Sequence, residues 1–210
     1  MIVTAIERQK RRPRVNVFLD GRLAISLSVA LAAQAGLRRG DVVTAGRLES
    51  LRQADERQQA RDAALHLLAY RPRSEEELRS RLARRGLPPG VVEETIDRLR
   101  EQSLLDDAAF ARYWVEARQR SSPRGRGLLR RELLAKGIAT ETAGEAVAAV
   151  ADEEAARRAA EKKARTLRTL DYPTFRRRLG QFLLRRGFPY ETARTLVDEL
   201  WRQSQRASSA

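Results

Sequence analysis

The sequence predicts a mainly α-helical protein that is built from tandem three-helix repeats, with a small N-terminal β-element. Two observations carry this prediction. A nine-residue phrase recurs three times, as LRSRLARRG at 78–86, LRRELLAKG at 129–137 and LGQFLLRRG at 179–187. The first 28 residues instead alternate apolar and polar side chains, which is the period of a β-strand. Because stacked helical repeats bury their faces against one another, we expect an elongated, curved body.

The N-terminal stretch predicts a β-hairpin with a third strand beside it. Two alternating runs, residues 15–19 and 23–27, flank the dipeptide Asp20-Gly21. Asp-Gly between such runs is typical of a two-residue turn, because both of its positions need positive φ. The segment IVTAIE at 2–7 supplies a third strand, since a lone hairpin is only marginally stable. The residues expected on the inward face are Val15, Val17, Leu19, Leu23, Ile25 and Leu27.

The recurring phrase is one part of a longer internal repeat. When it is aligned on its glycine, a proline, two leucines, a basic residue and several apolar positions recur in register. Leucines four apart lie on one helical face and enter a core, and glycine supplies the left-handed residue that ends a helix. The aligned sets are Gly86, Gly137 and Gly187; Pro72, Pro123 and Pro173; Leu78, Leu129 and Leu179; Leu82, Leu133 and Leu183; Arg85, Lys136 and Arg186; Leu87, Ile138 and Phe188; Ile96, Val147 and Val197; Leu99, Val150 and Leu200.

This alignment predicts the organisation of the whole chain. Each repeat is expected to be three helices, and in the first repeat Ser74 and Glu77 form a capping box after Pro72. The expected segments are an N-terminal region at 1–56, with the hairpin and a short helix from Ser28 to Gly36; repeat 1 at 57–105; repeat 2 at 106–151; repeat 3 at 152–204; and a disordered tail at 205–210.

The charge of the chain points to an acidic partner. The net charge is +14, and residues 152–210 hold 14 basic and 8 acidic residues. At the start of the second helix, Glu75–Glu77 of repeat 1 align with Arg176–Arg178 of repeat 3, and Arg126 takes the first of these positions in repeat 2. Cations there oppose the helix dipole, so either a partner retains them or they form a solvated face. The candidate partner-binding residues are Arg124, Arg126, Arg130, Arg131, Arg176, Arg177, Arg178, Arg185 and Arg186.

Some of these bases have a local explanation. Arg186 and its aligned counterparts Arg85 and Lys136 precede a helix-ending glycine, where a cation stabilises the exposed carbonyls by about 0.3–1 kcal/mol. No feature of the sequence indicates catalysis or a cofactor. There is no cysteine, His66 is the only histidine, and no glycine-rich loop leads into Lys-Ser or Lys-Thr. Asp106-Asp107 is interpreted as a helix cap rather than a metal site. We therefore expect a monomeric, cytoplasmic protein that is not an enzyme and binds no metal and no membrane.

The stretch from 73 to 120 resembles the RecX family of bacterial recombinase regulators. The matching pieces are the Ser-x-x-Glu-Leu helix that ends in a base, a glycine and an apolar residue, Leu-Leu-Asp-Asp at 104–107, and Phe110-Ala111. RRELLAKGI at 130–138 and RRGFPYETARTLVDEL at 185–200 match later phrases of the family, although members often have Gly-Pro where this chain has Gly125-Arg126.

The resemblance implies that the partner is the RecA filament on single-stranded DNA. RecX-like proteins lie in the groove of that filament and down-regulate its recombinase and ATPase activity. Three similar repeats could contact successive protomers and gain avidity from linked contacts. Two alternatives stay open: a helical-repeat protein that binds single- or double-stranded DNA through its basic face without RecA, and a scaffold unrelated to DNA.

Overall fold

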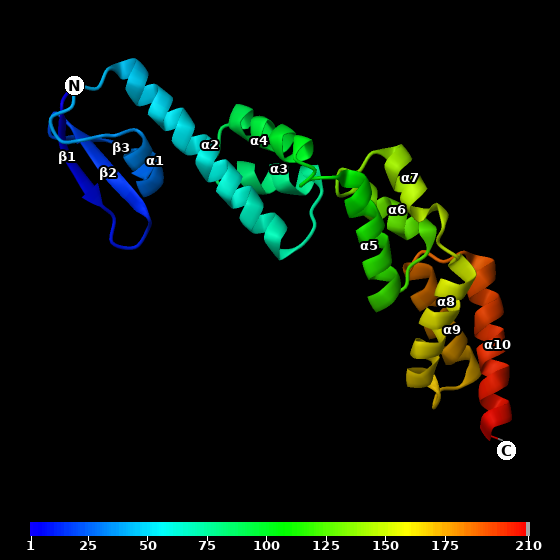
Figure 1. Cartoon of the computed structure of the whole chain (residues 1–210). Coiled ribbons are helices and arrows are strands. Elements are labelled where there is room, and N and C mark those ends of the chain that lie inside the picture. Colours follow the sequence, from blue (N-terminus) through cyan, green and yellow to red (C-terminus); the bar gives the residue numbers. More distant parts are fainter. Residues whose placement is uncertain (209–210) are drawn as a thin grey trace. The chain divides into compact units, whose positions relative to one another are not determined.

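The computed structural model describes residues 1–208 and is mainly helical, with one small sheet at the N-terminus (Figure 1). Both features confirm the predicted fold class. The elements in chain order are β1 (Val3–Arg8), β2 (Arg14–Leu19), β3 (Arg22–Ser28), α1 (Val29–Gln34), α2 (Ala45–Tyr70), α3 (Glu75–Ala83), α4 (Pro89–Glu101), α5 (Asp107–Ser121), α6 (Arg126–Leu134), α7 (Thr140–Ala148), α8 (Asp152–Ala164), the 3₁₀ turn η1 (Arg165–Leu167), α9 (Tyr172–Arg185) and α10 (Tyr190–Ser208).

The sheet is antiparallel in the order β1-β2-β3, so the hairpin and its third strand are confirmed. Asp20 and Gly21 join β2 to β3 with φ of 49° and 81°, which is the left-handed turn expected of Asp-Gly. The prediction for Leu23 is wrong, because this side chain is 59% exposed. The strand register shifts between Val17 and Phe18, and Leu23 consequently faces Phe18 instead of continuing the inward row.

A buried carboxylate fastens the sheet to the long helix α2. Asp55 is 3% exposed and pairs with Arg14 of β2 at 2.6 Å. It also accepts hydrogen bonds from the Ser28 amide at 2.9 Å and from Gln59 at 2.6 Å, so the buried charge is fully compensated. The helix is continuous through this point and crosses the boundary expected at 56/57, since no glycine or proline interrupts residues 47–70.

The chain divides into two compact units. The N-terminal unit holds Met1–Arg71 and Leu78–Gln102, with the sheet, α1, α2, α4 and most of α3. The C-terminal unit holds Pro72–Glu77 and the chain from Ser103 onward, with the helices of repeats 2 and 3. The first turn of α3 therefore packs with repeat 2, although the rest of that helix belongs to repeat 1.

The repeats have the predicted core. The six aligned leucines of α3, α6 and α9 are all 0% exposed. Gly86, Gly137 and Gly187 end these helices with φ of 79°, 81° and 79°. In repeats 2 and 3 the next residue, Ile138 or Phe188, is buried, and its amide donates to the carbonyl five residues earlier. This is the hydrogen bond of a glycine-terminated helix with an apolar residue packed backward.

The C-terminal helix α10 extends to Ser208, and so includes residues 205–208 of the tail expected to be disordered. Residues 209–210 of that tail lie outside the described residues. Within the described chain, no helix combines the length and hydropathy that a membrane span requires.

Candidate partner-binding surface

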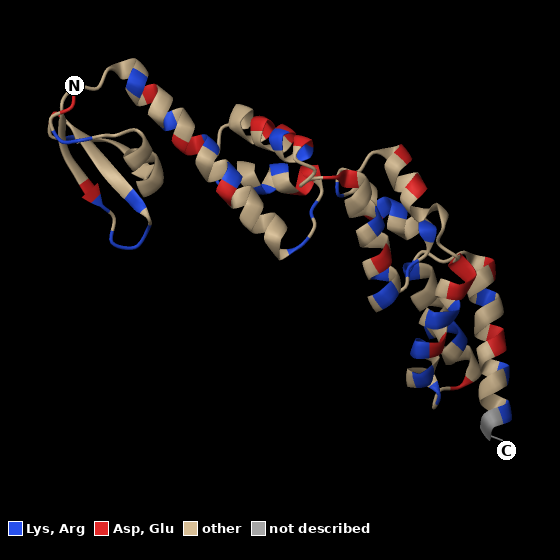
Figure 2. Ribbon diagram, viewed as in Figure 1, with Lys and Arg blue, Asp and Glu red and all other residues tan. Residues whose placement is uncertain are grey.

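The nine arginines proposed from the sequence all lie in the C-terminal unit. Four of them surround the start of α6, between Arg124 and Arg131, and five lie along α9, between Arg176 and Arg186. Figure 2 shows charges of both signs on α8 and acidic positions on α7, whereas α9 carries arginines and neither Asp nor Glu. The contacts of each arginine decide whether it can meet a partner.

The start of α3 is capped by repeat 2. The amide of Glu75 donates to a carboxylate oxygen of Asp107, at the start of α5, at 2.8 Å. The hydroxyl of Ser74 donates to the carbonyl of Lys136 at 2.7 Å, and it also accepts from the amide of Glu77 at 3.2 Å. The Ser74 half of the capping box is thus present, while the Glu77 carboxylate pairs with Arg73 at 2.7 Å, and a carboxylate from the next repeat satisfies a further amide of the same helix start.

The start of α6 is capped by repeat 3 in the same way. The amide of Arg126 donates to Asp152, at the start of α8, at 2.8 Å, and the amide of Gly125 donates to the carbonyl of Arg186 at 2.9 Å. Gly125 and Arg126 align with the residues that make these bonds in repeat 1. The guanidinium of Arg126 also lies 3.4 Å from Asp152. A charge partner within the protein therefore accounts for the cation at this helix start.

Glycines allow the repeats to approach closely at both junctions. A Cβ on Gly137 would lie 2.3 Å from Cβ of Glu76, and a Cβ on Gly187 would lie 2.4 Å from Cβ of Leu128. A Cβ on Gly125 would lie 2.3 Å from the carbonyl oxygen of Gly187. These three glycines are needed for packing between repeats, and for Gly137 and Gly187 this is in addition to ending a helix.

Arg124 belongs to a network inside the C-terminal unit. Its guanidinium pairs with Glu132, which also accepts from Trp114 Nε1 at 2.9 Å and from Arg118 at 3.1 Å. Burial lowers the pKa of Arg124, and the neighbouring charges of Arg118 and Arg186 lower it further. The side chain remains cationic but is committed to Glu132.

Arg186 is also partly buried within the unit. Its guanidinium donates to the carbonyl of Pro123 at 3.1 Å and lies 4.4 Å from the ring centroid of Phe182. Burial lowers its pKa as well. Arg186 thus connects repeat 3 to the loop before α6, and the part that Arg124 and Arg186 play toward a partner stays a prediction.

The remaining candidates are exposed. Arg130, Arg131, Arg185 and Arg176–Arg178 make no ion pair within residues 1–206, whose side chains the structure describes. Asp171 takes the capping position of α9, yet its side chain caps no amide. The expectation that these arginines stand at a helix start is wrong for repeat 3: α9 begins at Tyr172, so Arg176–Arg178 lie in its second turn, whereas the aligned Glu75 and Arg126 begin their helices.

The sequence did not indicate the inter-repeat caps. Asp107 was interpreted as part of a local cap together with Asp106, and Asp106 does cap α5 through the amides of Ala108 and Ala109 at 2.8 and 2.9 Å. Asp107 and Asp152 stand at different distances from Gly137 and Gly187, because repeat 3 has the additional turn η1 between its first two helices. An alignment on glycine therefore leaves the two aspartates out of register.

The described residues hold no cluster of three or more His, Cys, Asp or Glu side chains that could bind a metal ion. His66 is exposed on α2. The surface offers instead a set of cations and, on repeat 3, a groove. Both suit the binding of a partner.

Four sequence-family models match successive parts of the chain. The model of the regulatory protein RecX N-terminal domain matches residues 1–44. The models of the first, second and third three-helix domains of RecX match 60–99, 106–147 and 151–197.

Whole proteins and solved structures are similar to this chain over most or nearly all of its length. The regulatory protein RecX of Levilactobacillus brevis is 31% identical over 202 residues, covering 95% of this chain and 76% of that protein. That of Clostridium botulinum is 30% identical, covering 94% and 95%. A crystal structure of regulatory protein RecX has a TM-score of 0.64 at 27% identity, covering 94% of this chain and 98% of that one. The structure of RecX from Lactobacillus salivarius has a TM-score of 0.59 at 27% identity, covering 70% and 97%.

Proposed function

The chain belongs to the RecX family, and from that premise we propose that it binds the filament formed by RecA on single-stranded DNA and inhibits its recombinase and ATPase activity. The observation that supports this most is the row of exposed cations Arg176–Arg178, which pair with no acidic group among the described side chains. Three adjacent cations without an ion pair in the protein are complementary to an acidic surface on a partner. The net charge of +14 would also speed association with a nucleoprotein filament.

The first experiment is co-sedimentation with RecA filaments beside bare single-stranded DNA, at low and at physiological salt. Binding to bare DNA through phosphates falls steeply with salt, whereas a complex with protein contacts keeps more of its affinity. We expect retention on filaments at physiological salt and weak, salt-sensitive retention on bare DNA. Equal binding to both at every salt concentration would favour the alternative, a helical-repeat DNA-binding protein that acts without RecA.

The second experiment reverses the charges of Arg176–Arg178 to Glu. At about 0.5 kcal/mol for each of about six charge units, binding weakens by about 3 kcal/mol. This corresponds to a loss of roughly a hundredfold. The measurement is RecA ATPase activity on single-stranded DNA against increasing regulator, with circular dichroism to check the fold. The fold is expected to persist, because the three side chains are exposed and glutamate has a high helix propensity.

A matched control reverses Lys10, Arg11 and Arg12 to Glu. These residues are also exposed and consecutive, but they lie in the N-terminal unit. If both triple variants lose inhibition equally, the effect is one of net charge and the assignment to α9 fails. Unchanged inhibition by the folded α9 variant has the same consequence.

We also propose that the chain has no turnover of its own, and that it regulates by binding. The purified protein alone is expected to hydrolyse neither ATP nor DNA. A hydrolytic activity that follows the folded protein through purification, and that is lost on its mutation, contradicts this proposal.

A further inference from the structure

Repeat 3 has an open groove between α9 and α10. Its volume is about 400 Å³, and its lining includes Arg176, Arg177 and Arg194. Leu184 and Tyr190 also line it and are 44% and 58% exposed. Exposed apolar side chains next to arginines offer a place where a partner can bury an apolar group beside carboxylates.

The corresponding place in repeat 1 is closed by an ion pair. Arg79 of α3 reaches Glu93 of α4 through two contacts, at 2.7 and 3.1 Å. In the repeat alignment, Gly180 takes the place of Arg79 and Arg194 takes the place of Glu93. Repeat 3 has therefore lost the side chain that crosses the groove, and it has reversed the charge that this side chain would meet.

Packing does not explain Gly180. It lies inside α9, where glycine is the least favourable residue except proline. A Cβ at this position would meet no atom within 4 Å, and its φ is not in the positive range. This sets it apart from Gly187 of the same repeat, which both the turn and the neighbouring repeat require. Because Gly180 has no side chain, the groove stays open.

Repeats 1 and 2 indicate which chemical group binds beside the second helix of a repeat, which is α3, α6 or α9. In repeats 1 and 2, the side chain that accepts a hydrogen bond from the start of that helix is an aspartate, Asp107 or Asp152, which belongs to another segment of protein. In repeat 3 the aligned positions hold Arg176–Arg178, which lie in the second turn of α9 because this helix begins at Tyr172; their exposed guanidinium groups, rather than main-chain amides, are what a carboxylate can meet. Complementary chemistry is therefore an acidic protein segment, and the apolar lining adds the need for one apolar side chain.

We propose that the α9–α10 groove binds an acidic segment of a partner protein, with an apolar side chain in the groove and carboxylates on Arg176, Arg177 and Arg194. This inference rests on the proposed function, and it assigns the contact to the protein component of the RecA filament rather than to its DNA. The groove, not the cationic row alone, supplies the specificity.

The test closes the groove with the ion pair of repeat 1, in the double variant Gly180→Arg with Arg194→Glu. Both positions lie at the surface of helices, and replacing glycine favours α9, so the fold is expected to persist. Co-sedimentation with RecA filaments should weaken about tenfold or more, since a central apolar contact is lost. Binding to a bare thymidine oligonucleotide should change by less than about twofold, because net charge falls by only about one unit.

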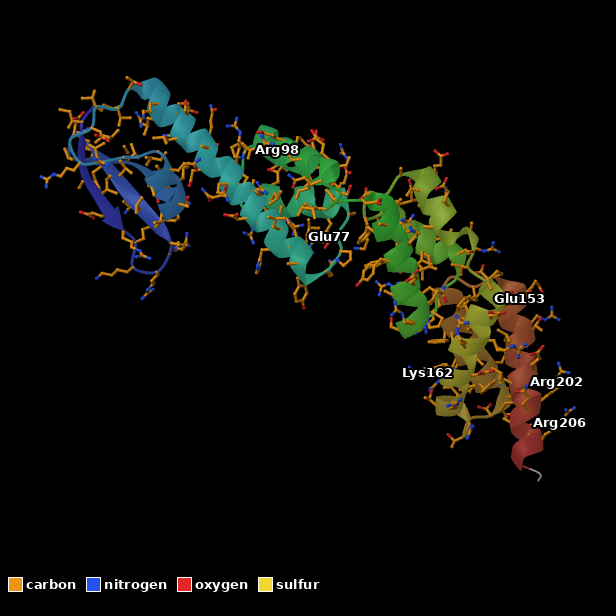
Figure 3. All side chains as sticks on the ribbon, in the orientation of Figure 1. Glu77, Arg98, Glu153, Lys162, Arg202 and Arg206 are labelled. Atoms are coloured by element: carbon orange, nitrogen blue, oxygen red, sulfur yellow. The ribbon has the colours of Figure 1, made fainter. Side chains whose placement is uncertain are left out.

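The matched control is Arg202→Gln, which also removes one positive charge from α10. Arg202 is exposed, donates to the carbonyl of Asp198 at 3.2 Å, and lies on the outer side of α10 (Figure 3). It should bind filaments like the unmodified protein. A second variant, Tyr190→Ala, removes apolar lining without changing charge and should weaken filament binding in the same direction.

The outcomes separate the two proposals. If the unmodified protein does not sediment with filaments, the proposed function fails and this inference fails with it. If it does sediment and both groove variants bind as well as it does, the proposed function stands and the groove assignment is overturned. Equal losses on filaments and on the bare oligonucleotide would assign the groove to DNA and overturn it too. A loss on filaments alone, absent from Arg202→Gln, supports it.

Discussion

Repeats 1 and 3 share a core and differ at the surface that surrounds it. The leucines of α3 and the leucines at the same positions of α9 are fully buried, and both helices end at a left-handed glycine. Around that core, Glu75–Glu77 become Arg176–Arg178, and the pair of Arg79 with Glu93 becomes Gly180 with Arg194. The buried positions are thus the same in both repeats, whereas the exposed positions differ in charge.

The two helix starts also differ in what covers them. The start of α3 meets Asp107 of repeat 2, whereas at the start of α9 the Asp171 side chain caps no amide and the Tyr172 hydroxyl donates to Asp198 of α10 at 2.8 Å. The acidic side chains at the start of α3 are compatible with the nearby Asp107, because a main-chain amide, rather than a side chain, forms the contact. The comparison teaches that aligned positions can differ in exposure to a neighbouring repeat: Glu75 at the start of α3 contacts repeat 2, whereas Arg176–Arg178, in the second turn of α9, stay exposed.

The largest expected effect comes from breaking the shared core. Leu78→Ala, Leu133→Ala and Leu183→Ala each remove a fully buried leucine and should lower the free energy of unfolding by about 2–5 kcal/mol. Urea unfolding followed by circular dichroism measures this. If one of the three loses less than about 0.5 kcal/mol, as an exposed position would, the repeats do not share their core.

The helix-ending glycines come next, and they separate repeat 3 from repeat 1. Gly86→Ala places a side chain at positive φ in open space, which costs about 1–2 kcal/mol. Gly187→Ala adds an overlap with Leu128, which costs about 1–3 kcal/mol more. Melting temperatures of the two variants give the comparison. Equal shifts would mean that repeat 3 does not press on repeat 2 at this point.

These glycines illustrate how far the sequence alone could go. Their role at helix ends was predictable, because the pattern of leucine, glycine and apolar residue depends on local geometry and recurs three times. Their role between repeats was not, because nothing in the sequence near Gly187 indicates that Leu128 lies against it. Contacts between distant segments follow from how helices pack, which an internal repeat does not specify.

The candidate surface likewise has features that the sequence could predict and features that it could not. That cations at helix starts need a reason was a sound argument from the dipole, but the reason differs between repeats. For Arg126 it is Asp152, which the sequence did not reveal, whereas Arg176–Arg178 need no such reason, because α9 begins at Tyr172 and places them in its second turn. The register shift that exposes Leu23 is a similar case, since the alternating pattern continues through it unchanged.

A smaller effect is expected where an aspartate of one repeat caps a helix of another. Asp152→Ala removes the acceptor for the Arg126 amide and should cost about 1 kcal/mol. Asp171→Ala is the matched control, because the Asp171 side chain caps nothing, and it should cost a few tenths at most. Thermal unfolding of both variants tests the difference. Identical melting temperatures would contradict the proposed role of Asp152 as a cap between repeats.

The smallest effect concerns the ion pair that closes the groove of repeat 1. The hydrogen bond from Arg79 holds the pKa of Glu93 below its usual value, and the charges of Arg79 and Arg100 add to this, whereas partial burial acts in the opposite direction. Since the pKa is depressed in the folded state, the pair stabilises above the unfolded pKa of about 4.3, and this contribution is lost as pH falls through the folded value. Both side chains are about one third exposed or more, so Glu93→Gln should cost only about 0.2–0.5 kcal/mol at neutral pH.

The pH dependence of the stability lost in Glu93→Gln distinguishes repeat 1 from repeat 3. The difference in unfolding free energy between the unmodified protein and Glu93→Gln should shrink toward zero as pH falls from about 7 to about 3, because Glu93 becomes neutral like glutamine. Arg194→Gln, at the aligned position of repeat 3, replaces a group that stays charged across this range, and Arg194 has no ion pair among the described residues. The small effect of Arg194→Gln on the free energy of unfolding should therefore not follow the protonation of an acidic group at position 194. Urea unfolding at several pH values measures both, and a constant difference for Glu93→Gln would mean that its pair with Arg79 contributes nothing in solution.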